Sequence, residues 1–457
     1  MSLMVSISGI RGIVGDSLTP ETIIHYASAF ARYCAGAGRP LIIVGRDGRS
    51  TGPFVTDLIT GALRAAGADV RSLGICPTPT VQLAVEHERA AGGISVTASH
   101  NPMPWNGMKF VAPSGMFLDA AQNRAFWALA DAPPAYAPWE AIGTLTQDDS
   151  WIQKHIDAVL ALPYVNPESI RARRFRIVVD CVNAAGGVIV PRMLRALGCD
   201  VIEMNCEVSG VFRHTPEPVP ENLTDLAARV KQEKADLGIA VDPDVDRLVL
   251  IMEDGAPYGE EYTVATAVKF ILEKTPRPAG VRPTVVVNLS TTRAVEEIAR
   301  AAGADVRRTP VGEINVAKRM VELGSVIGGE GSGGVILPAV HAGRDAIVGI
   351  GLLLQFLAES AMPLSRVKAS LPGYAITKGK IILGSVSPDA ALRRVEDAYR
   401  ERAEVNTEDG LKLDFPESWV HLRKSNTEPI IRVNAEARSM EEAQNLVRSF
   451  TALLSAS

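Results

Sequence analysis

Short runs of β-branched and other apolar residues alternate along the chain with segments whose apolar residues recur at a helical period. Such a run, bounded by polar loops, predicts a buried strand, and the periodic segment after it predicts a helix packed on the sheet. One unit of strand, loop, helix, glycine and second strand occurs three times, with first strands at 41–44, 177–180 and 285–288. Each of its helices is followed by a glycine, which suits the left-handed conformation after a last turn: Gly67, Gly198 and Gly303.

The spacing of these units bears on the domain organisation. The copies lie roughly 110–135 residues apart, too far for the repeats of a solenoid. They favour three related α/β domains in series, because each copy carries its own polar loop. The alternative is one large α/β sheet.

The end of the chain has a different pattern. It predicts a strand at 378–383, a helix at 388–402, strands at 419–423 and 430–433, and a helix at 440–454. This order is typical of a small α+β domain. We therefore expect four domains, at 1–153, 154–257, 258–371 and 372–457, with a linker near Pro372.

Composition supports a large globular protein and excludes some classes of function. A chain of 457 residues exceeds the roughly 250–300 at which a single core stops growing. A net charge of −5 argues against non-specific nucleic-acid binding. The five cysteines form no C-x-x-C pair, which argues against a zinc site or disulfide framework. Without a signal-like start or a long apolar run, we expect a cytoplasmic protein that binds no membrane.

A serine stands on the polar loop after the apolar run at 93–96. The loop at 97–102 reads TASHNP and places Ser99 beside His100, with Lys109 ten residues further on. Open α/β sheets carry their reactive groups on loops at the carboxyl ends of strands. A serine alone is a poor nucleophile, so the neighbouring His and Lys make this loop a candidate for catalysis. The alternative is an Asn-Pro turn with a helix-capping serine.

Three alternating carboxylates, Asp242, Asp244 and Asp246, follow the apolar run at 237–241. Carboxylates on one loop can converge on a hard cation, which prefers oxygen ligands. The loop lacks the fixed Gly and distal Glu of an EF-hand. Because three carboxylates leave room for a phosphoryl oxygen, the loop predicts Mg²⁺, and the alternative is a solvated acidic turn.

A glycine-rich loop at 328–334 reads GGEGSGG. Glycines let a backbone approach a ligand closely, while Glu330 and Ser332 offer hydrogen bonds to sugar hydroxyls. No Gly-Lys-Ser/Thr follows, so the loop is not a P-loop. A flexible hinge is the alternative.

Two further segments offer cations to a phosphate. The turn at 423–429 reads RKSNTEP, with Arg432 on the next strand. A guanidinium, hydroxyls and an amide in one turn are what a phosphate dianion requires. Near the N-terminus, Arg11 stands between two glycines and could reach negative charge on a transferring phosphoryl group. The alternative for the turn is a solvated loop with a paired arginine.

Together and in this order, these segments resemble the α-D-phosphohexomutase family along essentially the whole chain. The most specific signal is the TASHNP loop found together with the Asp-x-Asp-x-Asp-Arg loop at 242–247. Members have four domains around a central cleft, and each domain gives one loop. The resemblance implies an enzyme that interconverts hexose 6-phosphate and hexose 1-phosphate through a phosphoserine and a bisphosphosugar.

The resemblance also implies a role for each candidate residue. Ser99 would hold the transferable phosphoryl group and bind Mg²⁺ together with the three aspartates. Glu330 and Ser332 would contact sugar hydroxyls. Lys109 is similar to the candidate general acid/base, a role that requires nearby cations to depress its pKa. The remaining positions are catalytic Arg11 and His100, and substrate-binding Arg247, Asp345, Arg423, Ser425, Asn426, Thr427 and Arg432.

Three positions depart from the family pattern. The motif at 8–12 reads SGIRG, where many members have an Asp before the Gly. Pro243 replaces a common Gly and should stiffen the metal loop without removing a ligand. The sugar loop ends in Gly334, where many bacterial members place His, so that acid/base duty passes to Lys109 or His100.

Two other functions are alternatives to a mutase. A sugar-phosphate-binding protein without turnover is disfavoured because none of the central residues is missing. A phosphatase is opposed by a closing cleft that excludes water. Among mutases, the Gly-ending sugar loop favours glucosamine phosphate, and phosphomannomutase/phosphoglucomutase activity is the alternative.

Overall fold

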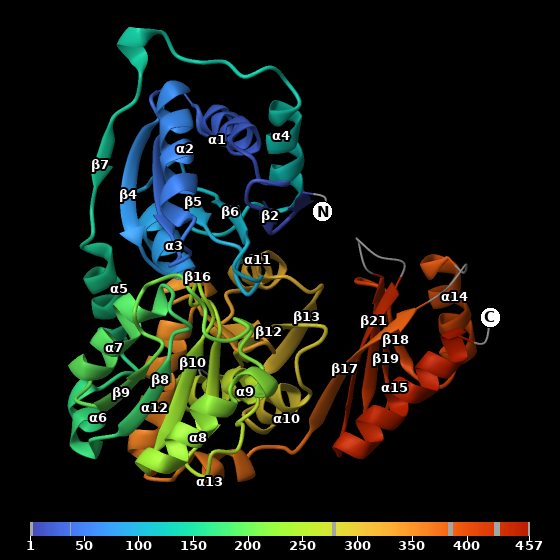
Figure 1. Cartoon of the computed structure of the whole chain (residues 1–457). Coiled ribbons are helices and arrows are strands. Elements are labelled where there is room, and N and C mark those ends of the chain that lie inside the picture. The colour runs from blue at the N-terminus through green and yellow to red at the C-terminus, as the bar shows by residue number, and fades with distance from the viewer. Residues whose placement is uncertain (1–2, 37, 277–279, 383–386, 425–429, 456–457) are drawn as a thin grey trace.

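The chain folds into four sheets that follow one another along the sequence (Figure 1). The computed structural model describes residues 3–36, 38–276, 280–382, 387–424 and 430–455. The first three sheets combine parallel and antiparallel pairs, whereas the last is antiparallel throughout. The predicted three α/β domains and smaller C-terminal domain are confirmed, and the alternative of one large sheet is wrong.

The first sheet has the order β1-β2-β6-β5-β3-β4-β7. Its strands are Met4–Ser6 (β1), Gly9–Ile13 (β2), Leu41–Arg46 (β3), Asp69–Ile75 (β4), Gly92–Val96 (β5), Trp105–Val111 (β6) and Leu145–Gln147 (β7). Its helices are Pro20–Cys34 (α1), Gly52–Ala65 (α2), Thr78–His87 (α3) and Ala120–Ala130 (α4). The apolar residues of β3 are fully buried from Ile42 to Val44, because this parallel strand is covered on both faces.

The second and third sheets have the orders β11-β10-β8-β9 and β13-β12-β14-β15-β16. The strands of the second are Arg176–Asp180 (β8), Asp200–Met204 (β9), Leu237–Val241 (β10) and Leu248–Met252 (β11). Those of the third are Thr284–Asn288 (β12), Asp305–Thr309 (β13), Ile327–Glu330 (β14), Gly334–Leu337 (β15) and His341–Arg344 (β16). The helices of this half are Trp151–Leu160 (α5), Pro167–Arg173 (α6), Gly186–Ala196 (α7), Thr224–Glu233 (α8), Glu260–Lys274 (α9), Ala294–Ala301 (α10), Glu313–Leu323 (α11), Ala346–Ser360 (α12) and Leu364–Ala369 (α13).

The repeated unit of the sequence is present in each α/β domain. Strands β3, β8 and β12 open the three copies, and β4, β9 and β13 pair with them in parallel. The glycines after the unit's helices have φ values of +91° (Gly67), +73° (Gly198) and +65° (Gly303). Each therefore holds the left-handed conformation that ends its helix, as predicted.

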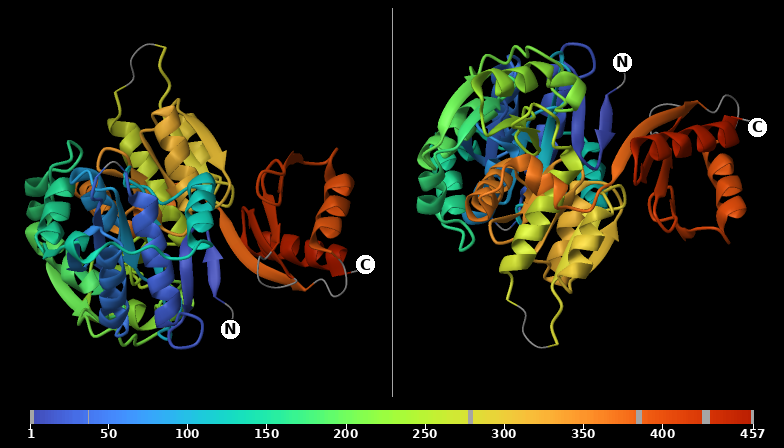
Figure 2. Two further views of the ribbon diagram at one scale, coloured as in Figure 1. Left: turned by 90° about the horizontal axis from the view of Figure 1, so that it is seen from above. Right: turned by 90° about the horizontal axis from the view of Figure 1, so that it is seen from below.

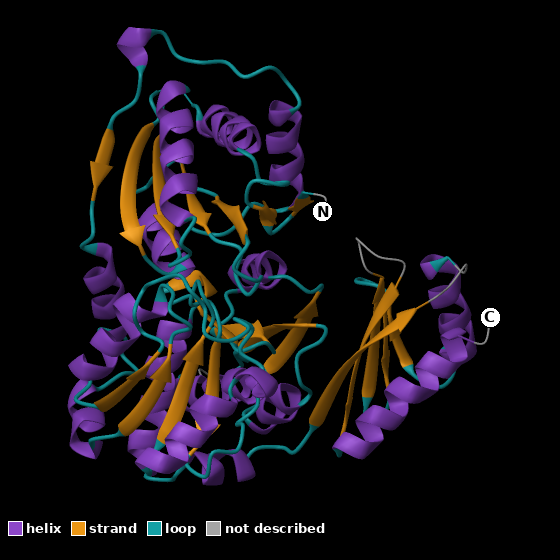
Figure 3. Ribbon diagram, in the orientation of Figure 1, coloured by secondary structure: helices purple, strands orange, loops and turns teal. Residues whose placement is uncertain are grey.

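The C-terminal sheet has the order β17-β21-β20-β19-β18. Its strands are Ala375–Ile382 (β17), Glu404–Asn406 (β18), Leu411–Asp414 (β19), Trp419–Lys424 (β20) and Ile430–Ala437 (β21), and its helices are Pro388–Tyr399 (α14) and Met440–Ser455 (α15). Figure 3 shows both helices on one face of this sheet. The sequence predicted the other elements but not β18 and β19, which are short and carry polar residues.

The apolar core divides the molecule unequally. One cluster of buried side chains runs through the first three domains, from Ile43 to Leu371. A separate cluster, between Ile381 and Leu454, belongs to the C-terminal domain, which projects from the other three (Figure 2). Over the described ranges, no helix combines the length and the apolar character needed to cross a bilayer.

Candidate active site

The loop after β5 carries Ser99, and the buried Arg49 fixes this loop through hydrogen bonds to its backbone. Ser99 has a left-handed backbone with φ of +49°. Arg49 donates from Nε to Asp47 Oδ2 at 3.0 Å. Its two terminal nitrogens donate at 2.6–2.9 Å to four loop carbonyls, those of Ser99, Asn101, Pro102 and Trp105. All five guanidinium N–H groups are thereby used, so Arg49 fixes the path of the loop.

A second chain of hydrogen bonds connects the same clamp to the serine. Thr97 Oγ1 donates to Asp47 Oδ2 at 2.7 Å and accepts from the Ser99 backbone N–H at 2.9 Å. Sequence reasoning missed Asp47 and Arg49 as site residues. The signal was available, since both lie in a charged loop directly after the buried strand β3.

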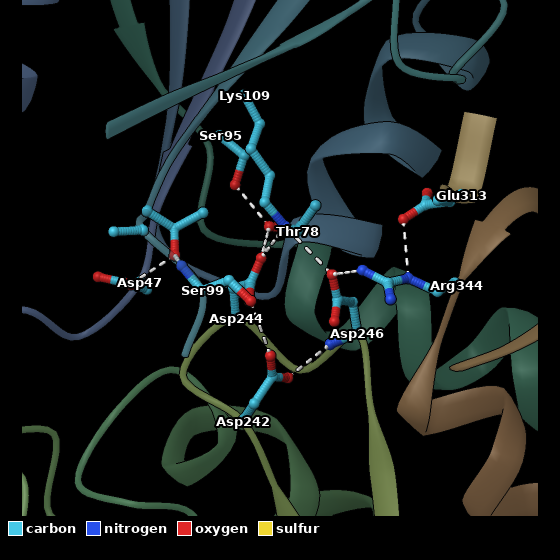
Figure 4. A network of polar contacts seen from close by, with 12 residues as sticks. Asp47, Thr78, Ser95, Ser99, Lys109, Asp242, Asp244, Asp246, Glu313 and Arg344 are labelled. Atoms are coloured by element: carbon cyan, nitrogen blue, oxygen red, sulfur yellow. Dashed lines mark hydrogen bonds and ion pairs between the residues drawn. The ribbon is translucent and has the colours of Figure 1, made fainter. Parts of the chain in front are cut away.

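The three aspartates lie on the loop between β10 and β11, facing Ser99 (Figure 4). All three carboxylates are fully buried, and they offer ligand atoms within 4.8 Å of one another. Ser99 Oγ donates to Asp242 Oδ2 at 3.1 Å. Asp244 Oδ1 and Asp246 Oδ1 are buried without a hydrogen-bond partner among the described residues. Buried carboxylate oxygens without a hydrogen bond, on three residues whose ligand atoms lie this close, fit a hard divalent cation, so the triad could hold a metal.

Lys109 reaches the triad from strand β6. Its Nζ lies 2.6 Å from Asp244 Oδ2 and 3.1 Å from Asp246 Oδ2. Thr78 Oγ1, at the start of α3, also donates to Asp244 Oδ2, at 2.6 Å. Burial lowers the pKa of Lys109, but the two carboxylates outweigh it and hold that pKa above its usual value. These carboxylates therefore keep Lys109 protonated, whereas proton exchange by Lys109 would require a lowered pKa.

The aspartates differ in how strongly they hold a proton. Burial raises the pKa of Asp242 well above its usual value, and the neighbouring carboxylates add to the effect. Burial also acts on Asp246, but Arg344 and then Lys109 outweigh it and hold the pKa of Asp246 below its usual range. Cations around Asp246 therefore keep that carboxylate charged, whereas Asp242 lacks so close a partner.

His100 follows the serine and contacts a second arginine. Its Nδ1 lies 3.3 Å from Ser99 Oγ and 3.1 Å from Arg247 Nη2. Burial, together with the charges of Arg247 and Arg11, lowers the pKa of His100 to about 2. The imidazole is thus neutral, and its Nδ1 accepts because an arginine can only donate. Arg11 itself donates to Asn101 Oδ1 at 3.0 Å.

The sugar loop presents Glu330 at the end of β14. Glu330 Oε1 accepts from Asn288 Nδ2 and from the Gly312 backbone N–H, both at 2.8 Å. Its Oε2 lies 3.0 Å from Arg344 Nη1. These partners fix the carboxylate while leaving it on the wall of a cavity of about 530 Å³.

That cavity lies where the four domains meet. Its lining includes predicted residues from each of them: His100, Arg247, Glu330, Ser332, Arg423 and Arg432. A space of this size with cations, carboxylates and hydroxyls on its wall suits a small, polar, anionic ligand. The predicted phosphate-loop residues Ser425, Asn426 and Thr427 lie outside the described residues.

Asp345, predicted to bind substrate, lies in the interior next to Arg344. The residue is fully buried, and its Oδ1 caps helix α12 by accepting from Ile347 N at 2.8 Å. Its Oδ2 lies 2.7 Å from His155 Nε2 and 3.1 Å from His341 Nε2. Both oxygens are therefore engaged in the interior, and the contact between Asp345 and substrate stays a prediction.

Several residues of the cavity wall were not foreseen from the sequence, among them Arg344 and Glu261. Arg344 precedes Asp345 at the end of β16 and reaches the metal loop and the sugar loop. Glu261, at the start of α9, lies against the sugar loop and accepts from the Thr292 backbone N–H at 2.9 Å. The signal for Arg344 was its position directly before Asp345, a predicted site residue. No feature of the helix pattern around Glu261 distinguishes that residue from its neighbours.

Comparison with known proteins places this geometry in a family. Models of the phosphoglucomutase/phosphomannomutase α/β/α domains I, II and III match residues 4–135, 153–255 and 259–374, and the model of the C-terminal domain matches 385–453. The chain is 35% identical over 445 residues to a probable phosphoglucosamine mutase of Methanopyrus kandleri, covering 97% of this chain and 96% of that protein. It is 36% identical over 440 residues to a phosphoglucomutase/phosphomannomutase of Thermococcus kodakarensis, covering 95% of each.

A solved structure agrees with these sequence matches. The X-ray structure of a phosphoglucomutase/phosphomannomutase family protein from Burkholderia thailandensis is similar with a TM-score of 0.84 at 28% identity. The match covers 99% of this chain and 98% of that one.

Proposed function

The chain belongs to the α-D-phosphohexomutase family and is a phosphohexomutase, and from this premise we propose that it interconverts hexose 6-phosphate and hexose 1-phosphate through a phosphorylated Ser99. The observation that carries the proposal is the position of Ser99 Oγ, 3.1 Å from Asp242 Oδ2 and beside a cavity lined from four domains. The substrates would be a hexose phosphate and the bisphosphosugar formed from it.

The reaction would divide among the loops. Phosphorylated Ser99 would donate its phosphoryl group to one sugar hydroxyl, and the bisphosphosugar would turn in the cavity and return its other phosphoryl group to Ser99. Such a transfer depends mainly on positioning and on charge stabilisation. Glu330 and Ser332 would hold sugar hydroxyls, while Arg423 and Arg432, with Ser425, Asn426 and Thr427, would hold the phosphate that does not react.

Asp242, Asp244 and Asp246, together with Ser99, would hold Mg²⁺, which supplies positive charge to the moving phosphoryl group. Lys109 and Arg11 bring further positive charge to the same place. Neutral His100 accepts at Nδ1 from Arg247, beside the serine hydroxyl that donates to Asp242. The raised pKa of Lys109 suits a positive charge at this place, and the lowered pKa of His100 suits a neutral hydrogen-bond acceptor. Changing Asp244 to Asn should weaken Mg²⁺ dependence, and full wild-type activity in excess chelator would contradict the metal assignment.

For the preferred sugar we propose glucosamine phosphate, with mannose and glucose phosphates as the alternative. The named relatives include both a phosphoglucosamine mutase and a phosphoglucomutase/phosphomannomutase. Glu330 can accept from hydroxyls that all three sugars share, and the glycines around it offer no side chain to the carbon-2 substituent. Discrimination should therefore amount to about one hydrogen bond, ~0.5–1.5 kcal/mol or roughly tenfold.

The test is turnover of glucosamine, glucose and mannose 6-phosphates, each with Mg²⁺ and a bisphosphosugar activator. We expect all three to isomerise, with glucosamine 6-phosphate ahead. A preference of more than a hundredfold for mannose or glucose phosphate would overturn the sugar assignment. Release of inorganic phosphate without isomerisation would favour the phosphatase reading instead.

A further inference from the structure

Arg344 connects two loops that belong to different domains. Its Nη2 lies 2.7 Å from Asp246 Oδ2 on the metal loop, and its Nη1 lies 3.0 Å from Glu330 Oε2 on the sugar loop. The remaining donor, Nε, lies 3.1 Å from Glu313 Oε2 at the start of α11. The side chain is 11% exposed, so its charge is largely shielded from water. One guanidinium therefore bridges three carboxylates.

A glycine of the sugar loop lies against this side chain. A Cβ placed on Gly334 would come 2.3 Å from Arg344 Cδ and 2.9 Å from Cγ. The three atoms nearest to that position all belong to Arg344. Because Gly334 has no positive φ, its backbone would accept an alanine, and the obstacle is the arginine alone. The Arg344 side chain thus occupies the space that a side chain at position 334 would need.

We propose that Arg344 is a positioning residue that couples the metal loop to the sugar loop, and that Gly334 is required because it leaves room for this arginine. The proposal rests on the proposed function, since it assigns the two loops their ligands. Glu330 has its other oxygen fixed by Asn288 and Gly312, so Arg344 determines where the second oxygen points. The same contact compensates the charge of Asp246.

A permanently charged group suits this task. A guanidinium does not give up its proton in proteins, so Arg344 takes no part in proton transfer. Its planar fork presents donors in fixed directions, which a lysine ammonium cannot copy. Arg344→Lys would keep the charge but could not bridge two carboxylates in the same plane. Both the metal site and the sugar contact should therefore respond when the fork is moved.

A double-mutant cycle tests the proposal. Gly334→Ala keeps every charge and should push the guanidinium off Asp246 and Glu330. We expect a tenfold or greater fall in kcat/KM and weaker Mg²⁺ binding in calorimetry. In an Arg344→Ala background the atoms at 2.3 and 2.9 Å are gone, and the Cβ of residue 344 remains at 3.4 Å from the added methyl, which is ordinary contact. There Gly334→Ala should change kcat/KM less than twofold. Gly61→Ala is the matched control: no packing atom lies within 4 Å of the added Cβ, so kcat/KM and Mg²⁺ binding should stay unchanged.

The outcomes distinguish a failure of the coupling between Gly334 and Arg344 from a failure of the proposed mutase activity. If Gly334→Ala costs the same factor with and without Arg344, or costs nothing in the wild type, the coupling is absent and the proposal is wrong. Thermal unfolding identifies any variant that loses the fold, and Arg344→Lys supplies a second variant with the charge retained. If the wild type isomerises no hexose phosphate, the proposed function fails, while the Mg²⁺ calorimetry on the same four proteins still decides whether Gly334 and Arg344 are coupled.

Discussion

Ser99 is held in a backbone conformation that few residues other than glycine adopt, with φ of +49°. Such a conformation persists only where the surroundings determine it. Here the surroundings are the Asp47–Arg49 clamp, which binds the loop carbonyls rather than the serine hydroxyl. The hydroxyl is left to face Asp242 and His100.

Removing that hydroxyl should separate catalysis from folding. Ser99→Ala should lower turnover to background, while the melting temperature stays close to that of the wild type, because the clamp holds backbone atoms only. Mass spectrometry should find one phosphate on active wild-type protein, at Ser99, and none at this position in the variant. Near-normal mutase activity in Ser99→Ala would show that another residue carries the phosphoryl group.

A change in the Asp47–Arg49 clamp should lower kcat by displacing the loop that carries Ser99. Arg49→Lys keeps a positive charge beside Asp47 but cannot bond four loop carbonyls at once. A displacement of the loop by about 1 Å should lower kcat about 100-fold with little change in KM. The control is Arg71→Lys in the same domain, an arginine paired with Glu88 away from the loop. Equal kcat values for Arg49→Lys and the control would contradict a positioning role.

At the scale of elements, the start of helix α9 lies against the glycine-rich loop at 328–334 through Glu261. A Cβ on Gly331 would come 1.9 Å from Glu261 Oε2, so the loop and the carboxyl are in close contact. Burial, with a further contribution from Glu260, raises the pKa of Glu261 to about 8. In the unfolded chain a glutamate titrates near 4.3. Between these values the folded protein holds a proton that the unfolded chain has lost.

This difference makes stability depend on pH with a definite sign. The contribution of protonated Glu261 is fully present below the unfolded pKa, and it is lost as pH rises through the folded pKa near 8. Glu261→Gln keeps an oxygen for the Thr292 N–H but cannot ionise. The melting temperature of the variant should therefore rise relative to the wild type between pH 6 and pH 8.5. If the melting temperatures of the two proteins change with pH in parallel across this range, the raised pKa of Glu261 is contradicted.

The elements foreseen from the sequence share one physical property. Strands β3, β8, β10 and β12 are nearly all apolar because parallel strands in these sheets are buried on both faces, and such runs stand out. Strand β19 is also buried but contains Lys412, whose charge is paired with Asp414. Pairing between side chains is invisible in a local pattern, and this is why β19 was missed. The same limit hid Arg344, whose three partners are distant in sequence.

At the scale of the whole molecule, the C-terminal domain is attached to the third domain by polar contacts rather than by a shared core. Arg293, before α10, donates to Asp414 Oδ1 and to the Phe415 carbonyl. Ser290 Oγ lies 2.8 Å from His421 Nδ1 on β20. Polar interfaces between domains of one chain permit relative motion, so we expect the cavity to close by movement of this domain.

The side chain of Tyr262 is one of the groups that hold the linker between these domains. Tyr262 Oη accepts from the Tyr374 backbone N–H at 2.8 Å and lies 3.1 Å from the carbonyls of Pro372 and Tyr374. Tyr262→Phe removes these bonds while keeping the ring, and it should widen the range of C-terminal domain positions before substrate binds. Because the residues proposed to hold the phosphate, Arg423 and Arg432, belong to this domain, the variant should raise KM more than it lowers kcat.

Small-angle scattering measures the motion directly. Wild-type protein with Mg²⁺ should become more compact on adding saturating glucose 1-phosphate, and Tyr262→Phe should begin from a more extended state and reach the same compact one. Tyr26→Phe, a tyrosine of helix α1 in the first domain, is the matched control and should scatter like the wild type. A profile that stays the same at saturating ligand would mean that the cavity is rigid, and the four domains would then have to bind, turn and return the bisphosphosugar without closing around it.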